Sequence, residues 1–421
     1  MVSLAPTDIA RYECYGLAFW RGSQGIALLP STQCSFLLSS APFPALHALP
    51  QEYPPLTVLL FSLPLLTPLP YYALIFALLM TLVALGLYRL LARSGASEAA
   101  PIFLFYLVLG TGAVVQERFD LLPAACTLIC LLAAERGHWR VAYLALALGV
   151  LLKLYPILLL PALFLAEQHS YREQPASAEK PTKKRFRIWQ RSQNCLLFAV
   201  ICIGIMGGFA LINYSDALIS PLRYFLQRPF QIEALASSLL WLGKFSGVPY
   251  TINFDFGSLN IQSGLAQFIS PLCTLFAIIG TLVALWLQWS RRIELATSMV
   301  GLICVLLVTG KVFSPQYLIW LFPLLAYISA RRKTTRLEML GWLLVSVLTT
   351  FIYVVYYSQL AHPESAAATV QTLPGFFEMV ALRNLLLLVT VLCFLLRNSL
   401  ARKPEEDTEK TSFISEHAKV S

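Results

Sequence analysis

Charged residues are scarce in this sequence, and their scarcity limits the class of protein. Asp, Glu, Lys and Arg make up 13% of the 421 residues, while 57% of the residues are hydrophobic. Soluble domains usually carry roughly 25% charged residues. A water-soluble fold cannot bury this much apolar surface, so the composition excludes an ordinary soluble domain and indicates a polytopic membrane protein.

Several motifs that carry chemistry are also absent. The five histidines are far apart in the sequence, and it contains no P-loop, GxGxxG turn or HExxH motif. These absences exclude a histidine-based zinc site and the common nucleotide-binding loops. The net charge of +9 comes without an arginine stripe or interleaved aromatics, so we expect no nucleic-acid partner and assign the excess charge to inner membrane loops.

Seven of the nine cysteines lie in apolar segments, where they serve as small packing residues. Cys14 and Cys34 remain as the pair that could form a disulfide.

Long apolar runs predict an all-α, polytopic membrane fold with about nine full transmembrane helices. Residues 141–166 hold two shorter runs around Lys153, and we predict a pair of half-helices there. The run at 54–66 is also short and predicts an outer interfacial helix. The full segments are expected near 71–93, 101–115, 119–134, 194–214, 264–289, 296–311, 316–330, 337–357 and 384–399.

The distribution of basic residues predicts the topology, because inner loops collect Lys and Arg. The loop at 167–193 is rich in both, so we place it in the cytoplasm, and alternation puts the basic stretches at 135–140, 291–292 and 331–336 on the same side. Of the 31 Lys and Arg residues, 22 then fall inside, 8 outside and one, Lys153, at the apex of the half-helix pair. Residues 401–421 form a polar cytoplasmic tail.

The chain divides into an outer N-terminal loop at 1–53 and a transmembrane domain at 54–400, which includes an outer loop at 215–260. Residues 1–53 contain no run long enough to span a membrane. Either these residues form a genuine outer N-terminal tail, or a first helix that would precede Asp8 is missing from this chain, and we favour the missing helix.

Polar residues that interrupt the apolar segments gather on the predicted outer face. Four of them are cations near aromatic residues, prolines or segment ends: Lys153, Arg228, Lys311 and Arg383. Cations that converge at one bilayer surface suggest an anionic ligand, and Arg and Lys suit a phosphate. For Lys153, snorkelling of the side chain to the interface is the alternative.

Acidic residues on the same face are candidates for proton transfer, which needs one carboxylate beside the electrophile. Asp8 precedes a helical pattern, so it is either such a base or a helix N-cap. Glu52 lies in QEYPPL and is either a site residue or part of a turn. The stretch QERFD at 116–120, with Arg118 and Asp120, is either part of the site or an ordinary outer loop.

An ordered set of motifs resembles glycosyltransferase family 87, a branch of the GT-C superfamily. The motifs are EYPPL, ERFDLLPA, LALGVLLKLYPILLLPAL, RPFQIEALASSLLWL, GKVFSPQYLIWLFPLLA and LRNLLLL, and the likeness covers about residues 8–398. The resemblance implies a membrane enzyme that moves a hexose, typically mannose, from a polyprenyl-phosphate donor to a lipid or glycan acceptor, with inversion. It also implies a multi-pass protein of the plasma (inner) membrane whose active site faces the extracytoplasmic side.

The same resemblance implies roles for individual residues. The family's catalytic acid matches Asp8, four residues before Tyr12. We assign Lys153, Arg228, Lys311 and Arg383 to the donor phosphate or sugar. The acids form no ligand cluster, so we expect no metal ligand and no cofactor, although some GT-C enzymes use a divalent metal. The residues expected to shape the pocket are Glu52, Arg118, Asp120, Gln231, Glu233 and Gln316.

Two other functions compete with a glycosyltransferase. A transporter or lipid flippase would line a pathway with these charges, but such proteins usually bind substrate near the midplane between repeated halves, and the sequence shows no internal repeat. A structural subunit would leave the converging cations unexplained.

Overall fold

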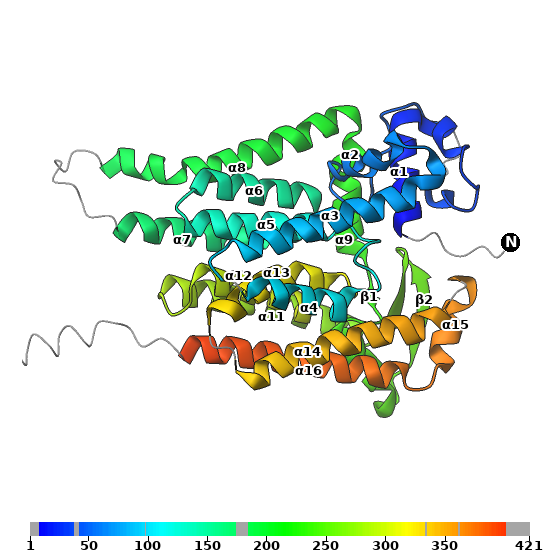
Figure 1. Ribbon diagram of the computed structural model, residues 1–421. Coiled ribbons are helices and arrows are strands. Elements are labelled where there is room, and N and C mark those ends of the chain that lie inside the picture. The colour runs from blue at the N-terminus through cyan, green and yellow to red at the C-terminus, as the bar shows by residue number, and fades with distance from the viewer. Residues whose placement is uncertain are drawn as a thin grey trace, which may run out of the picture.

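The computed structural model describes residues 8–37, 42–96, 98–173, 184–332, 335–360 and 363–400. Helices run side by side along one axis, and a small sheet lies with α1 (Asp8–Ile26) and α15 (Pro363–Thr372) at one end of the bundle (Figure 1). We call this end the sheet end and the opposite end the far end. The tail predicted at 401–421 lies outside the described residues.

Five helical segments are long and apolar enough to cross a membrane. The apolar windows of α8 and α11 have mean hydropathies of 2.7 and 2.2, yet only 6% of each window is buried in the protein. Exposed apolar helices of this kind are stable against lipid, so the predicted all-α, multi-pass membrane fold is confirmed. The segments contain α3 (Tyr72–Ala92), α8 (Lys184–Ile212), α11 (Ala266–Trp289), α14 (Arg336–Phe351) with η8 (Ile352–Tyr356) and η9 (Tyr357–Gln359), and α16 (Phe376–Leu400).

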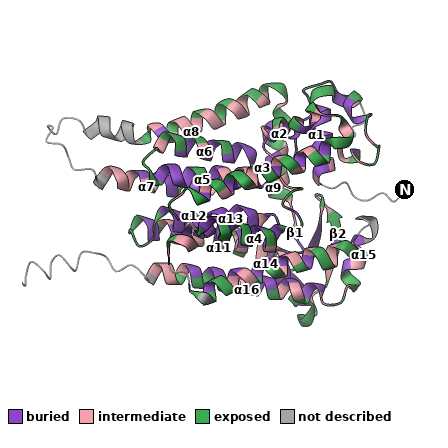
Figure 2. Cartoon of the chain, viewed as in Figure 1, coloured by how far each residue is buried: buried purple, intermediate pink, exposed green. Residues whose placement is uncertain are grey.

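Shorter helices occupy the middle of the bundle. Most residues of α5, α6, α12 and α13 are buried, as the purple ribbons in Figure 2 show. At ~1.5 Å per residue they are ~20–23 Å long, shorter than a ~30 Å hydrocarbon layer. They are α4 (Ala99–Thr111), α5 (Leu121–Glu135), α6 (Trp139–Leu152), α7 (Leu160–Glu173), α12 (Leu295–Thr309) and α13 (Tyr317–Arg331).

The pair predicted as half-helices has the length of its neighbours. Helix α6 has 14 residues and packs along α5, which has 15. The chain turns at Lys153 and returns through η4 (Tyr155–Leu159) and α7. Lys153 contacts Asp120 at the start of α5, so the apex reaches the same level as the start of α5. We therefore describe a helical hairpin within a core of short helices rather than two half-helices.

The predicted outer loop at 215–260 contains a sheet that the sequence reading missed. Strand β3 (Ser258–Ser263) pairs antiparallel with β1 (Phe230–Gln231) and with β2 (Tyr250–Asp255). Alternating polar and β-prone residues around Phe256-Gly257 in YTINFDFGSLNIQS were the signal for a hairpin. Phe256 and Gly257 both have positive φ, 49° and 67°, as a two-residue hairpin turn requires.

Short helices complete the sheet end. The segment predicted as an interfacial helix is α2 (Thr57–Ser62) followed by η2 (Leu63–Leu66), and it packs against α1. The remaining elements are η1 (Ser35–Leu37), η3 (Leu69–Tyr71), η6 (Ser215–Ile219), α9 (Ser220–Gln227), α10 (Leu235–Leu242) and η7 (Gly243–Ser246).

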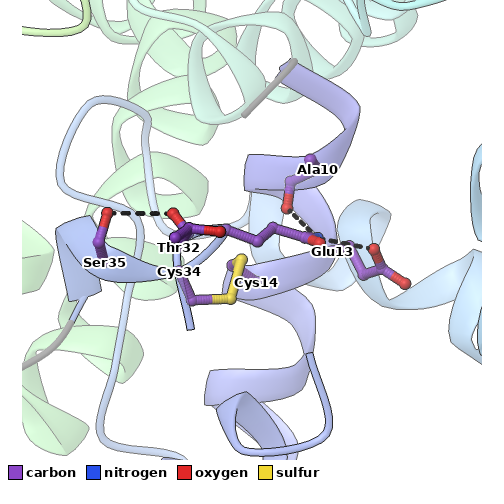
Figure 3. Close-up of a disulfide and its surroundings, with 7 residues drawn as sticks. Ala10, Glu13, Cys14, Thr32, Cys34 and Ser35 are labelled. Carbon is purple, nitrogen blue, oxygen red and sulfur yellow. Dashed lines mark hydrogen bonds between the residues drawn. A yellow bond between two sulfur atoms is a disulfide. The ribbon is translucent and has the colours of Figure 1, made fainter. Parts of the chain in front are cut away.

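A disulfide fastens the loop after α1 back onto that helix. Cys14 and Cys34, the pair that the sequence analysis left as a possible disulfide, are bonded to each other. Figure 3 shows the disulfide beside Glu13. Gln33 donates hydrogen bonds to the carbonyl of Ala10 (3.2 Å) and to Glu13 (2.9 Å). The first turns of α1, which carry Asp8, are thereby held to the loop.

The far end is closed by ion pairs between helices. Arg331 pairs with Glu135 at 2.7 Å, and Arg332 pairs with Glu294 at 3.3 Å. The predicted basic stretches around 135–140 and 331–336 therefore lie together at this end. Helix α7 ends at Glu173 and α8 begins at Lys184, so the predicted loop at 167–193 is partly helical, and its middle, 174–183, lies outside the described residues.

Removal of the disulfide tests how firmly α1 is held. The bridge spans a sequence separation of 20, for which loop closure corresponds to about 3 kcal/mol. We expect the Cys14→Ala/Cys34→Ala variant to unfold at a lower temperature in detergent, as measured by intrinsic fluorescence. Cys393→Ala, which replaces an exposed free cysteine, should unfold like the wild type. Equal midpoints for all three proteins would contradict this role.

Candidate active site

Asp8 forms an ion pair with Arg118, and the pair joins α1 to the loop before α5. Burial alone would lower the pKa of Arg118, but the carboxylate of Asp8 has the opposite effect, and the pKa lies above the ordinary value. Arg118 therefore stays cationic and orients the Asp8 carboxylate. Both side chains keep some exposure, 23% for Asp8 and 18% for Arg118, so a ligand can reach the carboxylate.

A second pair, between Arg11 and Glu52, lies about one helical turn from Asp8. Glu52 also accepts hydrogen bonds from the hydroxyls of Tyr15 (3.2 Å) and Tyr224 (3.4 Å). Burial lowers the pKa of Arg11, but Glu52 raises it, with a net rise. Glu52 therefore links α1 to α9 through its contacts. The sequence did not predict that Arg11, Tyr15 and Tyr224 contact Glu52.

Lys153 and Asp120 form a third pair at the ends of α6 and α5. The ammonium lies 2.5 Å from Asp120 Oδ1, and Trp320 Nε1 donates to the same oxygen at 2.5 Å. Four rings surround the ammonium at 5.1–5.9 Å from their centroids: Tyr53, Phe119, Tyr317 and Trp320. Because its charge is already compensated by a carboxylate and by aromatic faces, Lys153 is better suited to support the site than to bind a donor phosphate.

An aromatic cluster separates this third pair from the first one. Tyr12 stacks on Phe61 with centroids 4.3 Å apart, and both rings meet Phe119 edge-on. Tyr53 packs against the same rings, and burial raises the pKa of its hydroxyl well above the ordinary value. The cluster excludes water from one side of the site, which strengthens the electrostatic interactions around it.

Arg228 and Lys311 line one cleft of about 240 Å³. The cleft is formed by the end of α9, strand β3, the start of α11 and the loop before α13. Arg228 donates to Ser258 Oγ at 3.1 Å and stacks over Tyr224, and Lys311 lies near the ring of Phe230. Within the described part of the chain, neither cation has an acidic partner within ion-pair distance, so their charges are available to an anion.

Gln231 holds the loop that carries Lys311. The side-chain amide of Gln231 exchanges two hydrogen bonds with Ser314 Oγ, at 2.8 and 3.1 Å, and its backbone N–H donates to the carbonyl of Lys311 at 2.9 Å. Gln316 precedes α13 and is buried. Gln231 therefore fixes the position of the loop that carries Lys311 at the edge of the cleft.

Arg383 does not lie where the sequence reading placed it. Helix α16 begins at Phe376, so Arg383 is inside the helix rather than in an outer loop. Its side chain is fully buried, 3.5 Å from Glu233, and donates to the carbonyl of Glu233 at 2.8 Å. An arginine sealed against a carboxylate cannot reach a donor phosphate. Arg383 and Glu233 instead fasten α16 to the segment between β1 and α10.

The tip of the β2–β3 hairpin touches three of the site residues. The carbonyl of Phe256 accepts a hydrogen bond from Tyr224 at 2.7 Å, and Ser258 contacts Arg228. Between them, Gly257 packs so closely on Arg11 that a Cβ at this position would overlap the guanidinium. The hairpin thus joins the Arg11–Glu52 pair to the cleft.

The described residues contain no group of three or more His, Cys, Asp or Glu side chains that could hold a metal ion.

Comparisons with known proteins give a limited result. No protein-family model matches the chain, and no curated protein matches it. Two solved structures of ArnT from Cupriavidus metallidurans, one bound to undecaprenyl phosphate and one in the apo state, share 15% sequence identity with TM-scores of 0.45 and 0.42. Each alignment covers 94% of this chain and 73% of the other. With TM-scores below 0.5, the function has to be argued from this chain's own residues.

Loss of the buried Arg383–Glu233 pair should affect stability. Removing one partner leaves an uncompensated buried charge, which costs about 3–5 kcal/mol. We expect Arg383→Ala to lower the thermal midpoint in detergent strongly. Arg397→Ala removes a pair whose arginine is 40% exposed, and should have a much smaller effect. An Arg383→Ala protein of normal stability that binds a polyprenyl-phosphate donor poorly would restore Arg383 to the donor site.

Proposed function

We propose that this protein is a membrane glycosyltransferase that moves a hexose from a polyprenyl-phosphate donor to a lipid or glycan acceptor. The observation that carries this proposal is the arrangement of a partly exposed carboxylate, Asp8, with a nearby cleft lined by two cations without acidic partners among the described residues, Arg228 and Lys311. Glu52 and Tyr224 connect the two sides. A base on one side and an anion site on the other are what sugar transfer from a phosphate requires.

In the proposed reaction, Asp8 accepts the proton of an acceptor hydroxyl. The hydroxyl oxygen attacks the anomeric carbon as the bond between that carbon and the phosphate oxygen breaks. The polyprenyl phosphate leaves with the bonding electrons, and Arg228 and Lys311 stabilise its charge as it develops. Because the attack comes from the face opposite the leaving group, the anomeric configuration inverts.

The membrane-facing surface beside the cleft suits a lipid-linked donor. Ala266 and Ser270 at the start of α11 line the cleft, and the first three turns of this helix also expose apolar side chains that include Phe268, Leu272 and Phe276. A phosphate between Arg228 and Lys311 would thus lie next to an apolar surface that can pack against the polyprenyl chain.

Two observations support an outward-facing active site in the plasma (inner) membrane. The predicted inner basic stretches lie at the far end, opposite the site, as expected if that end faces the cytoplasm. The Cys14–Cys34 disulfide lies at the sheet end, and disulfides persist mainly in oxidising compartments. Membership of glycosyltransferase family 87 and mannose as the hexose remain proposals, supported by the ordered sequence motifs.

Substitution of the base should stop transfer without unfolding the protein. Asp8→Asn keeps the size of the side chain and removes the proton acceptor, so we expect transfer from a polyprenyl-phosphate hexose to fall by about 10²–10⁴-fold. Product formation can be followed by mass spectrometry. The matched control is Glu117→Gln, which neutralises an acid one residue from Arg118 and should retain most activity. Near-normal transfer by Asp8→Asn would remove Asp8 from the catalytic role.

Substitution in the cleft should weaken donor binding. Arg228→Ala and Lys311→Ala each remove a charged contact to the phosphate, and we expect the donor KM to rise by roughly 10- to 100-fold. The control is Lys244→Ala, a cation at the sheet end that stacks on Trp241 and Phe245 outside the cleft. Three variants with the same donor KM would argue against the phosphate site.

A further inference from the structure

A second cavity, of about 400 Å³, opens at the sheet end and shares no lining residue with the donor cleft. It lies between residues of η1 and of 43–51 on one side and the turn that follows α8 on the other. The residues that line it are Phe36, Leu37, Phe43, His47, Ala48, Leu49, Gln51, Asn213, Ser215 and Asp216. None of the functional roles assigned above uses this cavity.

The lining has the chemistry of a carbohydrate site. The rings of Phe36 and Phe43 offer flat apolar faces, the amide of Gln51 offers hydrogen-bond donors and acceptors, and the carboxylate of Asp216 offers acceptors. Among the described residues, neither lysine nor arginine lines the cavity, so the lining does not offer the positive charge that would favour an anionic ligand. A neutral sugar ring suits both the aromatic and the polar lining residues. Its C–H face can pack on an aromatic ring, and its hydroxyls can form hydrogen bonds with the amide and the carboxylate.

Several of the polar groups are already held in place. The side-chain amide of Asn213 donates to the carbonyl of His47 at 2.9 Å and to Asp216 Oδ2 at 3.1 Å, and its oxygen accepts from the backbone N–H of Asp216 at 3.2 Å. The backbone of Phe43 is tied to Ser23 by hydrogen bonds of 2.8 and 3.1 Å. Both walls of the cavity are therefore built before a ligand arrives, which lowers the entropic cost of binding.

The cavity adjoins the Arg11–Glu52 pair. The guanidinium of Arg11 lies 4.8 Å from the ring centroid of Phe36, and Tyr15 meets the same ring edge-on at 5.3 Å. Gln51 directly precedes Glu52. On its other side, Glu52 contacts Tyr224, which stacks under Arg228 of the donor cleft. The two cavities thus flank the Arg11–Glu52 pair, about one helical turn from Asp8.

We infer that this cavity binds a neutral saccharide unit of the acceptor. Its role as an acceptor site rests on the proposed function, whereas its affinity for a neutral saccharide does not. In transfer, the cavity would hold the acceptor while one hydroxyl reaches Asp8 from the side opposite the departing phosphate.

Binding can be measured without any transfer reaction. The full-length protein in lipid nanodiscs is mixed with methyl α-mannopyranoside, and saturation-transfer NMR reports contact with the sugar ring. We expect about tenfold weaker binding to Gln51→Ala and to Phe43→Leu, which remove an exposed amide and an aromatic face. The control is Gln262→Ala, an exposed glutamine that lines the donor cleft, and it should bind the sugar like the wild type. Glucuronate should bind more weakly than the neutral sugar because Asp216 repels its carboxylate.

Three results would overturn the inference: no saturation transfer to the wild type, equal binding by the wild type and Gln51→Ala, or an equal loss in Gln51→Ala and Gln262→Ala. The proposed function is judged separately, by transfer from a polyprenyl-phosphate hexose. If the protein binds the saccharide at this cavity but transfers no sugar, the inferred binding site stands and the proposed glycosyltransferase function is wrong.

Discussion

A charge inside a membrane bundle must be compensated by a partner. This constraint decides which of the four cations noted in the sequence are available to bind a ligand. Removing an ion from water costs several kcal/mol unless a partner repays it. Lys153 meets the constraint with Asp120 and four aromatic rings, and Arg383 meets it with Glu233. Arg228 and Lys311 have no acidic partner among the described residues and lie in a cleft, so an anion from outside the chain can supply the compensation.

The short central helices follow from the same constraint. Helices α5 and α13 begin at the level where α6 and α12 end, and this level holds Asp120, Lys153, Gly310 and Gln316. Full-length helices would replace these polar ends with apolar turns and leave no room for a site. The long helices α8 and α11, whose surfaces are mostly exposed, lie around this core. Because the central helices are shorter than these outer ones, the polar helix ends lie below the level that the outer helices reach.

The sequence was sufficient for the membrane class and the helix order, because apolar runs of this length have few other uses. It also singled out Asp8, Glu52, Arg118 and Asp120 as candidate site residues on the predicted outer face. It could not pair them, since pairing depends on contacts between segments that are distant in sequence, such as Arg11 with Glu52. It placed Arg383 in an outer loop because polar residues before 384 interrupted the apolar run. In the structure, α16 begins at Phe376, seven residues before Arg383. The strands were missed because a hydropathy scan treats any polar stretch as loop.

The missed hairpin is the part of the fold that unites the site. Tyr224, Arg11 and Arg228 come from two helices and from the segment after one of them, yet all three contact consecutive residues of one turn, Phe256 to Ser258. A helix would place successive side chains on different faces, whereas a tight turn presents a carbonyl, a bare Cα and a hydroxyl in one direction. Gly257 is required on two grounds, its positive φ and its contact with Arg11. Through this turn, the geometry of the cleft lined by Arg228 and Lys311 depends on the same arginine that holds Glu52 beside the second cavity.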